Sequence, residues 1–247
     1  MASTTETGHA KNVAHLDELI SFVLGYGTDY NPSKPSIKSD ALQTLSGYAK
    51  KAIDGVNAAL PAYSNAVAAR EAAFAPLSKL VTRVLNALKA TDTTNQVDEN
   101  ANTFARKIQG KRATAKKTEA EKKAEVDAGK EVVEISSSQM SYDSRLDNFD
   151  KFIKLLASVS LYAPNEEDLK VTALTALYND LKTKNNAVVS ATIPLSNARI
   201  SRNDVLYKAN TGLVDTAMDA KTYIKSLFGA TSPQFKQVSK LEFNTLK

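Results

Sequence analysis

The chain has 247 residues with no cysteine and no tryptophan, and its formal net charge is +5. The lack of cysteine excludes disulfide bonds and thiolate sites, and so small a charge permits contact with nucleic acid or anionic lipid without requiring it. Because glycine and proline are few (9 and 7) and helix formers are abundant, the composition predicts an all-α protein.

Residues 1–12 form a polar lead without the basic-then-apolar layout of a signal peptide. No run of 18 apolar residues occurs, so no ordinary transmembrane helix is expected. The default expectation is a cytoplasmic protein, with release by lysis or by a dedicated export machine left open. The two histidines, His9 and His15, are too few for a histidine metal site, and we expect both at the surface.

A short helix is predicted over about 13–26, because its leucine, isoleucine and valine residues recur on one face. Gly25 and Gly27 end this helix. The following loop, 28–36, contains Pro32 and Pro35, which are strong helix breakers.

A long helix is predicted over about 37–90. Its apolar residues alternate by three and four, which keeps one seam facing a partner helix. Pro61 and Pro76 each remove a backbone donor, and we expect them to kink this helix rather than end it. The seam consists of Ile53, Val56, Leu60, Tyr63, Val67, Phe74, Leu77, Val81, Val84 and Leu88.

Residues 91–147 are predicted to connect two helical units: a polar linker at 91–102, a charged helical segment at about 103–135 and a second break at 136–145. The charged segment opens with a block of six basic residues: Arg106, Lys107, Lys111, Arg112, Lys116 and Lys117. Such a block suits a nucleic-acid backbone or a lipid headgroup. No aromatic residue lies within it and no nucleic-acid motif surrounds it, so we favour a solvated helix whose basic end meets an acidic one.

The second unit is predicted to hold a short helix at about 146–160, a loop around Tyr162, and a long helix at about 166–228 that Gly229 terminates. The seam of the long helix consists of Leu174, Leu177, Leu181, Val188, Leu195, Val205, Leu213, Ala220, Ile224 and Leu227. A C-terminal tail, 229–247, follows with five large apolar residues: Phe235, Val238, Leu241, Phe243 and Leu246. Exposed apolar surface favours association, so we expect this tail to dock on its own bundle or on an adjacent copy.

The two units correspond to each other at an offset of 132–133 residues. Tyr30 and Pro32 match Tyr162 and Pro164, and Pro61 matches Pro194. This correspondence predicts two tandem pseudo-repeats, 13–90 and 148–228, which form one elongated all-α bundle with coiled-coil-like packing.

The middle of each long helix carries no charge, at 55–69 and at 185–198. One interpretation is a membrane-active element, but neither stretch reaches the roughly 20 apolar residues that a membrane span requires. We therefore expect the two stretches to be buried against each other, with Leu60 among the packed residues.

An arginine falls on each apolar seam, Arg70 and Arg202, at the same offset of 132 residues. The two could bind an anion or set the register of the helices. We favour a simpler arrangement in which the aliphatic stem packs on the seam and the guanidinium reaches water.

The segment Phe228-Gly-Ala-Thr-Ser-Pro-Gln-Phe-Lys-Gln-Val-Ser-Lys-Leu-Glu-Phe243, after a long helix rich in Ala, Asn and Lys, resembles a set of uncharacterised bacterial all-helical proteins. That resemblance covers about 16 residues. It implies an all-helical fold and a bacterial source, and it carries no activity or site residue.

The sequence contains no Ser-His-Asp or Glu-x-x-His pattern and no glycine-rich phosphate loop. We therefore expect a non-enzymatic structural or scaffolding protein without a cofactor, which associates with itself or with other proteins. The alternatives are a membrane-active protein resembling helical pore-forming toxins and a nucleic-acid-associated protein that uses residues 106–117.

Overall fold

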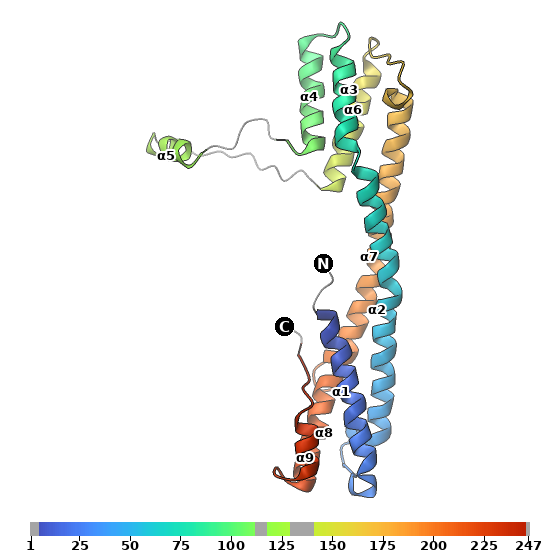
Figure 1. Cartoon of the computed structure of the whole chain (residues 1–247), viewed down its shortest axis with the longest axis vertical. Helices are drawn as coiled ribbons and strands as arrows, with labels where there is room; N and C mark the ends of the chain where they lie inside the picture. The colour runs from blue at the N-terminus through green and yellow to red at the C-terminus, as the bar shows by residue number, and fades with distance from the viewer. Residues whose placement is uncertain (1–4, 112–117, 129–140, 246–247) are drawn as a thin grey trace. The chain divides into compact units, whose positions relative to one another are not determined.

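The computed structural model describes residues 5–111, 118–128 and 141–245, and within them the fold is all-α without a strand (Figure 1). The α-helices are α1 (Thr5–Gly25), α2 (Ser39–Phe74), α3 (Leu77–Lys89), α4 (Asn95–Gln109), α5 (Glu119–Asp127), α6 (Tyr142–Ser158), α7 (Val171–Tyr207), α8 (Leu213–Phe228) and α9 (Pro233–Ser239). Three 3₁₀ turns lie in the loops before the two long helices: η1 (Gly27–Asp29), η2 (Pro35–Ile37) and η3 (Glu167–Leu169).

The chain divides into two compact units. Unit 1 comprises Met1–Tyr63 and Ala191–Lys247, and unit 2 comprises Ser64–Ser190. Both boundaries fall inside long helices, α2 and α7. Each unit therefore takes its helices from both of the segments that the sequence predicts as repeats.

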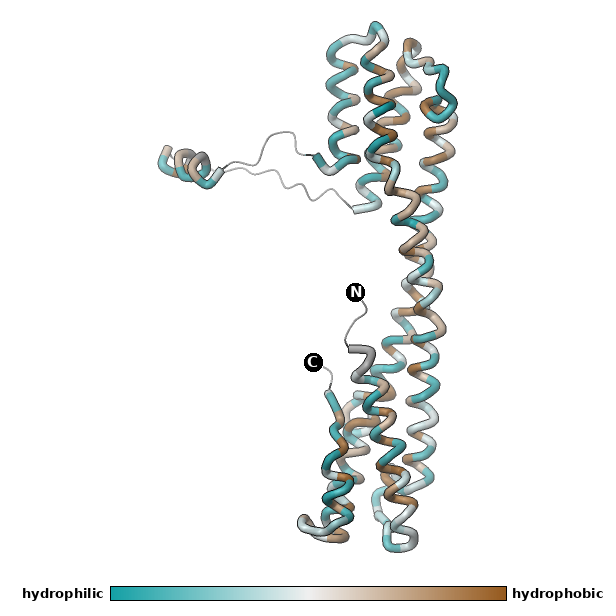
Figure 2. Tube along the Cα trace, viewed as in Figure 1, coloured by the Kyte–Doolittle hydropathy of each residue, from teal (hydrophilic) through white to brown (hydrophobic). Residues whose placement is uncertain are grey.

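The core of unit 1 joins the N-terminal part of the chain to its C-terminal part. Its buried residues come from α1, α2, the end of α7, α8 and α9. Leu16 and Leu19 of α1 are fully buried, as are Leu213 and Ile224 of α8. Apolar and polar residues alternate along α1 in Figure 2, as expected of a helix that is buried on one side.

The core of unit 2 is built from α3, α4, α6 and the beginning of α7. Helix α4 packs against both α3 and α6. Phe149 and Phe152 of α6 are fully buried there, together with Leu77 and Leu88 of α3.

Two breaks divide the long helices. Helix α2 ends at Phe74 and α3 starts at Leu77, so the prediction that Pro76 only kinks the helix is wrong. Pro76 has no N–H to continue the helical ladder, and its own carbonyl accepts from the N–H of Leu80 at 3.1 Å to start α3. The second long helix is likewise not continuous to 228, because residues 208–212 separate α7 from α8.

The second break is a tight turn that requires glycine. Asn210 has a positive φ of 65°, and the N–H of Gly212 donates to the carbonyl of Lys208 at 2.7 Å. A Cβ at Gly212 would lie 2.6 Å from the backbone nitrogen of Lys208. By contrast, Pro61 and Pro194 lie inside α2 and α7, as the sequence predicts.

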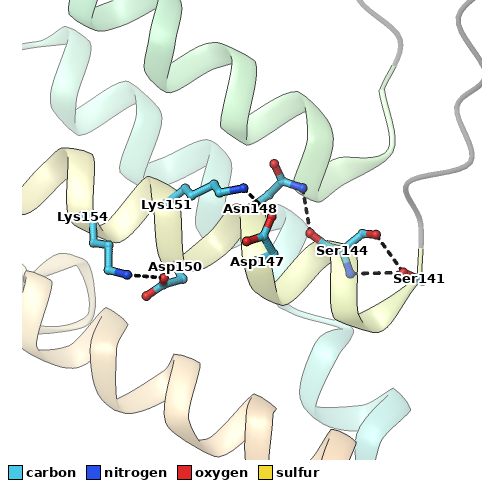
Figure 3. Close-up of polar contacts among 7 residues, drawn as sticks. All are labelled: Ser141, Ser144, Asp147, Asn148, Asp150, Lys151 and Lys154. Carbon is cyan, nitrogen blue, oxygen red and sulfur yellow. Dashed lines mark hydrogen bonds and ion pairs between the residues drawn. The ribbon is translucent and has the colours of Figure 1, made fainter.

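Several predicted boundaries shift. Helix α1 already begins in the polar lead, and α4 begins at Asn95, inside the predicted linker 91–102. Helix α6 begins at Tyr142 because the Oγ of Ser141 caps it by accepting from the N–H of Ser144 at 3.1 Å (Figure 3). Two exposed i,i+4 ion pairs of 2.6 Å follow on this helix, Asp147 with Lys151 and Asp150 with Lys154.

The loops before the two long helices share one contact. The buried hydroxyl of Tyr30 donates to the carbonyl of Ile37 at 2.7 Å, and the buried hydroxyl of Tyr162 donates to the carbonyl of Leu169 at 2.7 Å. Both pairs are seven residues apart in sequence. The match agrees with the offset of the sequence repeat, although the duplication of the whole unit remains a prediction.

Each of these loops also packs on a helix from the other half of the chain. In unit 1, η2 packs on α8, and Lys34 forms an ion pair with Asp219 at 2.5 Å. In unit 2, η3 packs on α3, and Arg83 forms an ion pair with Asp168. Each unit thus combines the start of one predicted repeat with the end of the other.

The charge-free stretches 55–69 and 185–198 are mostly exposed, which differs from the predicted burial. Val56, Val188 and Leu195 are buried as expected. Leu60 is 37% exposed, so the prediction that it packs in a core is wrong. The apolar residues of these stretches are too numerous for one buried seam, and the remainder face away from it.

Candidate functional site

An arginine–aromatic cluster lies in unit 2 where α2 ends and α6 begins. It consists of Arg70 and Phe74 of α2, Tyr142 and Arg145 of α6, and Asn185 of α7. The Phe74 and Tyr142 rings meet edge to face, with centroids 4.8 Å apart. The two arginines stack on these rings, so cation–π contacts join α2 to α6.

Arg70 is the sequence-predicted member of this cluster. Its guanidinium carbon lies 3.9 Å from the centroid of the Tyr142 ring, and its Nη1 donates to Oδ1 of Asn185 at 3.2 Å. Asn185 is only 4% exposed and donates in turn to Asp143 at 2.7 Å. The buried Nε of Arg70 has no hydrogen-bond partner. The guanidinium therefore contacts α6 and α7, as a register-setting residue would.

Arg145 caps two helix ends at once. Its Nε donates to the carbonyl of Ile108 in α4 at 3.2 Å, and its Nη2 donates to the carbonyl of Phe74 in α2 at 3.4 Å. Helix C-termini leave carbonyls without intrahelical donors and favour a nearby cation. Burial lowers the pKa of the Arg145 guanidinium, and nearby Tyr142 acts in the opposite direction.

Arg202, the sequence partner of Arg70, lies in unit 1 and is only 5% exposed. Its Nε and Nη2 donate to Oδ1 of Asn203 at 3.2 and 2.9 Å. The expectation that its guanidinium reaches water is therefore wrong. The two arginines, one in each unit, have different surroundings.

The basic block is described only in part. Arg106 and Lys107 lie in the last turn of α4, and Lys111 follows it. Lys107 and Lys111 are exposed, whereas Arg106 is half-buried and donates to Oγ1 of Thr103 at 3.3 Å. Cations at this position complement the helix dipole. The remaining members, Arg112, Lys116 and Lys117, lie outside the described residues.

The C-terminal tail docks on its own unit. Helix α9 packs on α8, Val238 is fully buried and Leu241 is 4% exposed. Phe235 and Phe243 are partly buried against the same core, and Leu246 lies outside the described residues. Of the two docking modes expected from the sequence, the structure shows the one within the chain.

Three side chains hold the main chain of this tail, and we call them the tail-binding face: Asn12 and His15 of α1, and Lys221 of α8. Lys221 is 9% exposed, and its ammonium donates to the carbonyls of Leu241 at 2.8 Å and Ser239 at 3.3 Å. Nδ1 of His15 donates to the carbonyl of Glu242 at 2.7 Å. Burial lowers the pKa of Lys221, and the charge of Glu242 acts against that shift.

Asn12 completes the tail-binding face with a two-way contact. Its Nδ2 donates to the carbonyl of Asn244 at 2.9 Å, and its Oδ1 accepts from the N–H of Asn244 at 2.8 Å. The hydroxyl of Tyr207 lies 3.4 Å from Nδ2 of Asn12 and 2.5 Å from Nδ1 of His9. His9 is 6% exposed, so the prediction that it is a surface residue is wrong.

A shallow groove of about 390 Å³ lies between α1 and α2 in unit 1. Its lining residues are Ala10, Val13, Ala14, Asp17, Lys50, Ile53 and Asp54. Asp17 is already engaged there, because its carboxylate accepts from Ser46 at 2.5 Å and pairs with Lys50 at 2.9 Å. The groove therefore offers no unpaired carboxylate at Asp17 for acid–base chemistry.

Among the described residues, no three histidine, aspartate or glutamate side chains lie close enough together to hold a metal ion. Over the same part of the chain, no helix combines the length and the apolar character needed to cross a membrane.

Comparison of the chain with protein-family models, with curated proteins and with solved structures gives no match.

Proposed function

We propose that this chain is a non-enzymatic structural or scaffolding protein whose copies associate with one another. The observation that carries the proposal is the exposure of large apolar residues of unit 1 that lie in or next to the charge-free stretches. Leu60 of α2 is 37% exposed, and Ile193 and Ile200 of α7 are 57% and 66% exposed. Exposed apolar residues that form a contiguous patch mark interaction sites, and the spacing along α7 favours such a patch there.

Helix α7 carries apolar residues on two sides. Leu195 and Leu206 are buried on one side, at 2% and 0% exposure. Ile193 and Ile200 are seven residues apart and so share another side, which is exposed. An ordinary surface helix is polar on the side away from its core. The second apolar side of α7 is therefore the surface that we assign to a partner.

The charge pattern favours a second copy as this partner. No charged residue occurs between Lys184 and Arg199 of α7, or between Asp54 and Arg70 of α2. A charged partner side chain buried against these charge-free stretches would find no opposite charge to pair with, which is costly. The partner surface is therefore expected to be free of charge over the same length. Each copy of the chain supplies surface of this kind, and a twofold contact pairs it with itself.

The test is the molar mass of the full chain over a range of concentrations, measured by light scattering after size exclusion. We expect an oligomer that dissociates in the double variant Ile193→Lys/Ile200→Lys. The control is Leu24→Lys, which charges an exposed apolar residue of α1 (52% exposed) outside the surface. A monomer at every concentration, or equal loss in both variants, contradicts the proposal. Binding of the same surface to anionic vesicles by a monomeric chain would instead favour the membrane-active alternative.

A further inference from the structure

The last described segment of the chain, 240–245, lies outside any helix, and side chains hold it by its main chain. Lys221 binds the carbonyl of Leu241, His15 binds that of Glu242, and Asn12 binds both the carbonyl and the N–H of Asn244. These four hydrogen bonds measure 2.7–2.9 Å. Because these bonds reach only backbone atoms, they depend on the course of the main chain and not on the identity of its side chains.

The side chains of the segment alternate between buried and exposed. Leu241 is 4% exposed and Phe243 is partly buried, whereas Glu242 and Asn244 are exposed. The Phe243 ring meets His15 edge to face at 6.1 Å and lies 5.9 Å from the ammonium of Lys221. Backbone hydrogen bonds combined with pockets for alternate side chains are how proteins recognise extended peptides.

The tail runs antiparallel to α1 and is joined to α8 by a short turn. Tyr26, just after α1, donates to the carbonyl of Gln234 at 3.3 Å, whereas Asn12, near the start of α1, contacts Asn244. The turn begins at Gly229, whose φ is 88°. Because Gly229 has no Cβ, a change of its backbone conformation costs little and redirects the tail that follows it.

We infer that the tail-binding face is a recognition site for an extended peptide, and that the C-terminal tail of a second copy occupies it by exchange. Every copy carries both the site and its ligand. An exchanged tail makes the same hydrogen bonds and buries the same Leu241 and Phe243 side chains as it does within one chain, so exchange costs little beyond the change at the turn. The inference rests on the proposed self-association and gives it a specific contact.

The experiment uses full-length chains in which new cysteines are the only ones, because the natural sequence has none. One chain carries Lys11→Cys beside Asn12, and the other carries Thr245→Cys beside Asn244. The two are mixed, warmed to release the tails, cooled and treated with a short bifunctional thiol reagent. The control is a single chain with both substitutions, which reports that the two positions lie within reach of the reagent.

We expect the mixed chains to give a covalent heterodimer. Asn12→Ala in the Lys11→Cys chain removes both hydrogen bonds to Asn244 and should lower the yield of the heterodimer. The same substitution in the doubly substituted chain should lower the yield of the internal cross-link as well, because the exchanged tail and the chain's own tail make the same contacts. An internal cross-link in the doubly substituted chain, together with no heterodimer in the mixture, overturns the inference.

The same mixture separates this inference from the proposed function. In a background carrying Ile193→Lys/Ile200→Lys, the heterodimer still forms if the tail-binding face alone carries the exchange. Light scattering that shows oligomers while no heterodimer forms overturns tail exchange and leaves the proposed function standing. A heterodimer in a chain whose mass does not respond to the Ile193→Lys/Ile200→Lys change supports tail exchange and overturns the helix-surface contact.

Discussion

The matched tyrosines of the two loops give the sharpest test of this structure. Tyr30→Phe and Tyr162→Phe each remove one hydroxyl and keep the ring. The hydroxyls donate at 2.7 Å to the carbonyls of Ile37 and Leu169, and both residues that supply these carbonyls are buried. Each substitution therefore leaves a carbonyl without its donor.

At neutral pH each variant should lose about 1–3 kcal/mol of unfolding free energy, the usual cost of a buried polar group left without a partner. Because the two contacts have equal length and lie between the same kinds of elements, we expect losses of similar size. Tyr48→Phe is the matched control, since Tyr48 is 57% exposed in α2, and this change should leave stability unaltered.

Alkaline pH adds a second signature. Burial, helped by the charges of Glu166 and Asp168, raises the pKa of Tyr162 from 10.0 to about 12. Burial also raises the pKa of Tyr30, with Tyr223 as a second cause. Between pH 10 and 12 the unfolded chain releases the Tyr162 proton and the folded chain retains it. Stability therefore falls as pH rises through this window, by about 1.4 kcal/mol at pH 11 for a shift of two units.

The assay is urea unfolding followed by circular dichroism at pH 8 and pH 11. Tyr162→Phe should be less stable than the natural chain at pH 8, and the gap should shrink by about 1.4 kcal/mol at pH 11 because the variant has no hydroxyl to titrate. A gap that stays constant with pH would refute the burial argument. A large loss in one variant and none in the other would count against the structural equivalence of the two loops.

Three further predictions concern single positions. Leu60→Ala should lower the free energy of unfolding by less than about 1.5 kcal/mol, because Leu60 is 37% exposed. Leu195→Ala should lower it by about 2–5 kcal/mol, because Leu195 is only 2% exposed. Equal losses in urea unfolding would contradict the exposure of Leu60 and the burial of Leu195. Gly212→Ala should destabilise the protein by about 1–3 kcal/mol or more, because the new Cβ would meet backbone atoms of Lys208. Gly47→Ala in α2 is the control, since its Cβ would meet nothing within 4 Å and the change should stabilise the protein by about 0.5–1 kcal/mol. Thermal melts that show the reverse order would disprove the turn geometry. Lys221→Met should make stability less sensitive to pH. Burial lowers the pKa of the Lys221 ammonium in the folded chain, so the natural chain gains stability as pH rises from that folded pKa toward the unfolded value of 10.5. Unfolding data in which the natural chain and the variant respond equally to pH would contradict this prediction.

The helices themselves follow from local pattern. Leu16, Leu19 and Val23 recur at helical spacing and are buried in α1, and Leu77, Val81, Val84 and Leu88 do the same in α3. Periodicity records which side of a helix is apolar, and that side is where burial occurs. It does not distinguish one apolar side from two, which is why Leu60 is exposed on α2 while Val56 is buried.

The helix breaks were harder to predict because a single proline has two outcomes. Pro61 remains inside α2, whereas Pro76 separates α2 from α3. Local sequence does not separate the two cases, because both prolines lack the backbone N–H in the same way. The break at 208–212 had a local signal that the prediction overlooked, since Asn210 and Gly212 are common turn residues.

The candidate site depends on contacts that are remote in sequence. Arg70 could be identified because it interrupts an apolar seam, but its partner Asn185 lies 115 residues away. His15 and Glu242 are 227 residues apart. Periodicity carries no information over such separations. The five apolar residues of the tail predicted that it docks, but the polar side chains that hold its main chain had no sequence signal.

The division of the chain into units also sets the order in which it can fold during synthesis. Unit 2 is one continuous stretch, Ser64–Ser190, and all of its core residues are available once that stretch has left the ribosome. Unit 1 needs Met1–Tyr63 together with Ala191–Lys247. The apolar side of α1 therefore waits for α8 through the translation of more than half the chain, a time in which exposed apolar surface favours aggregation. Among the described helices of unit 1, α1 is thus the one whose apolar side waits longest for its core partners.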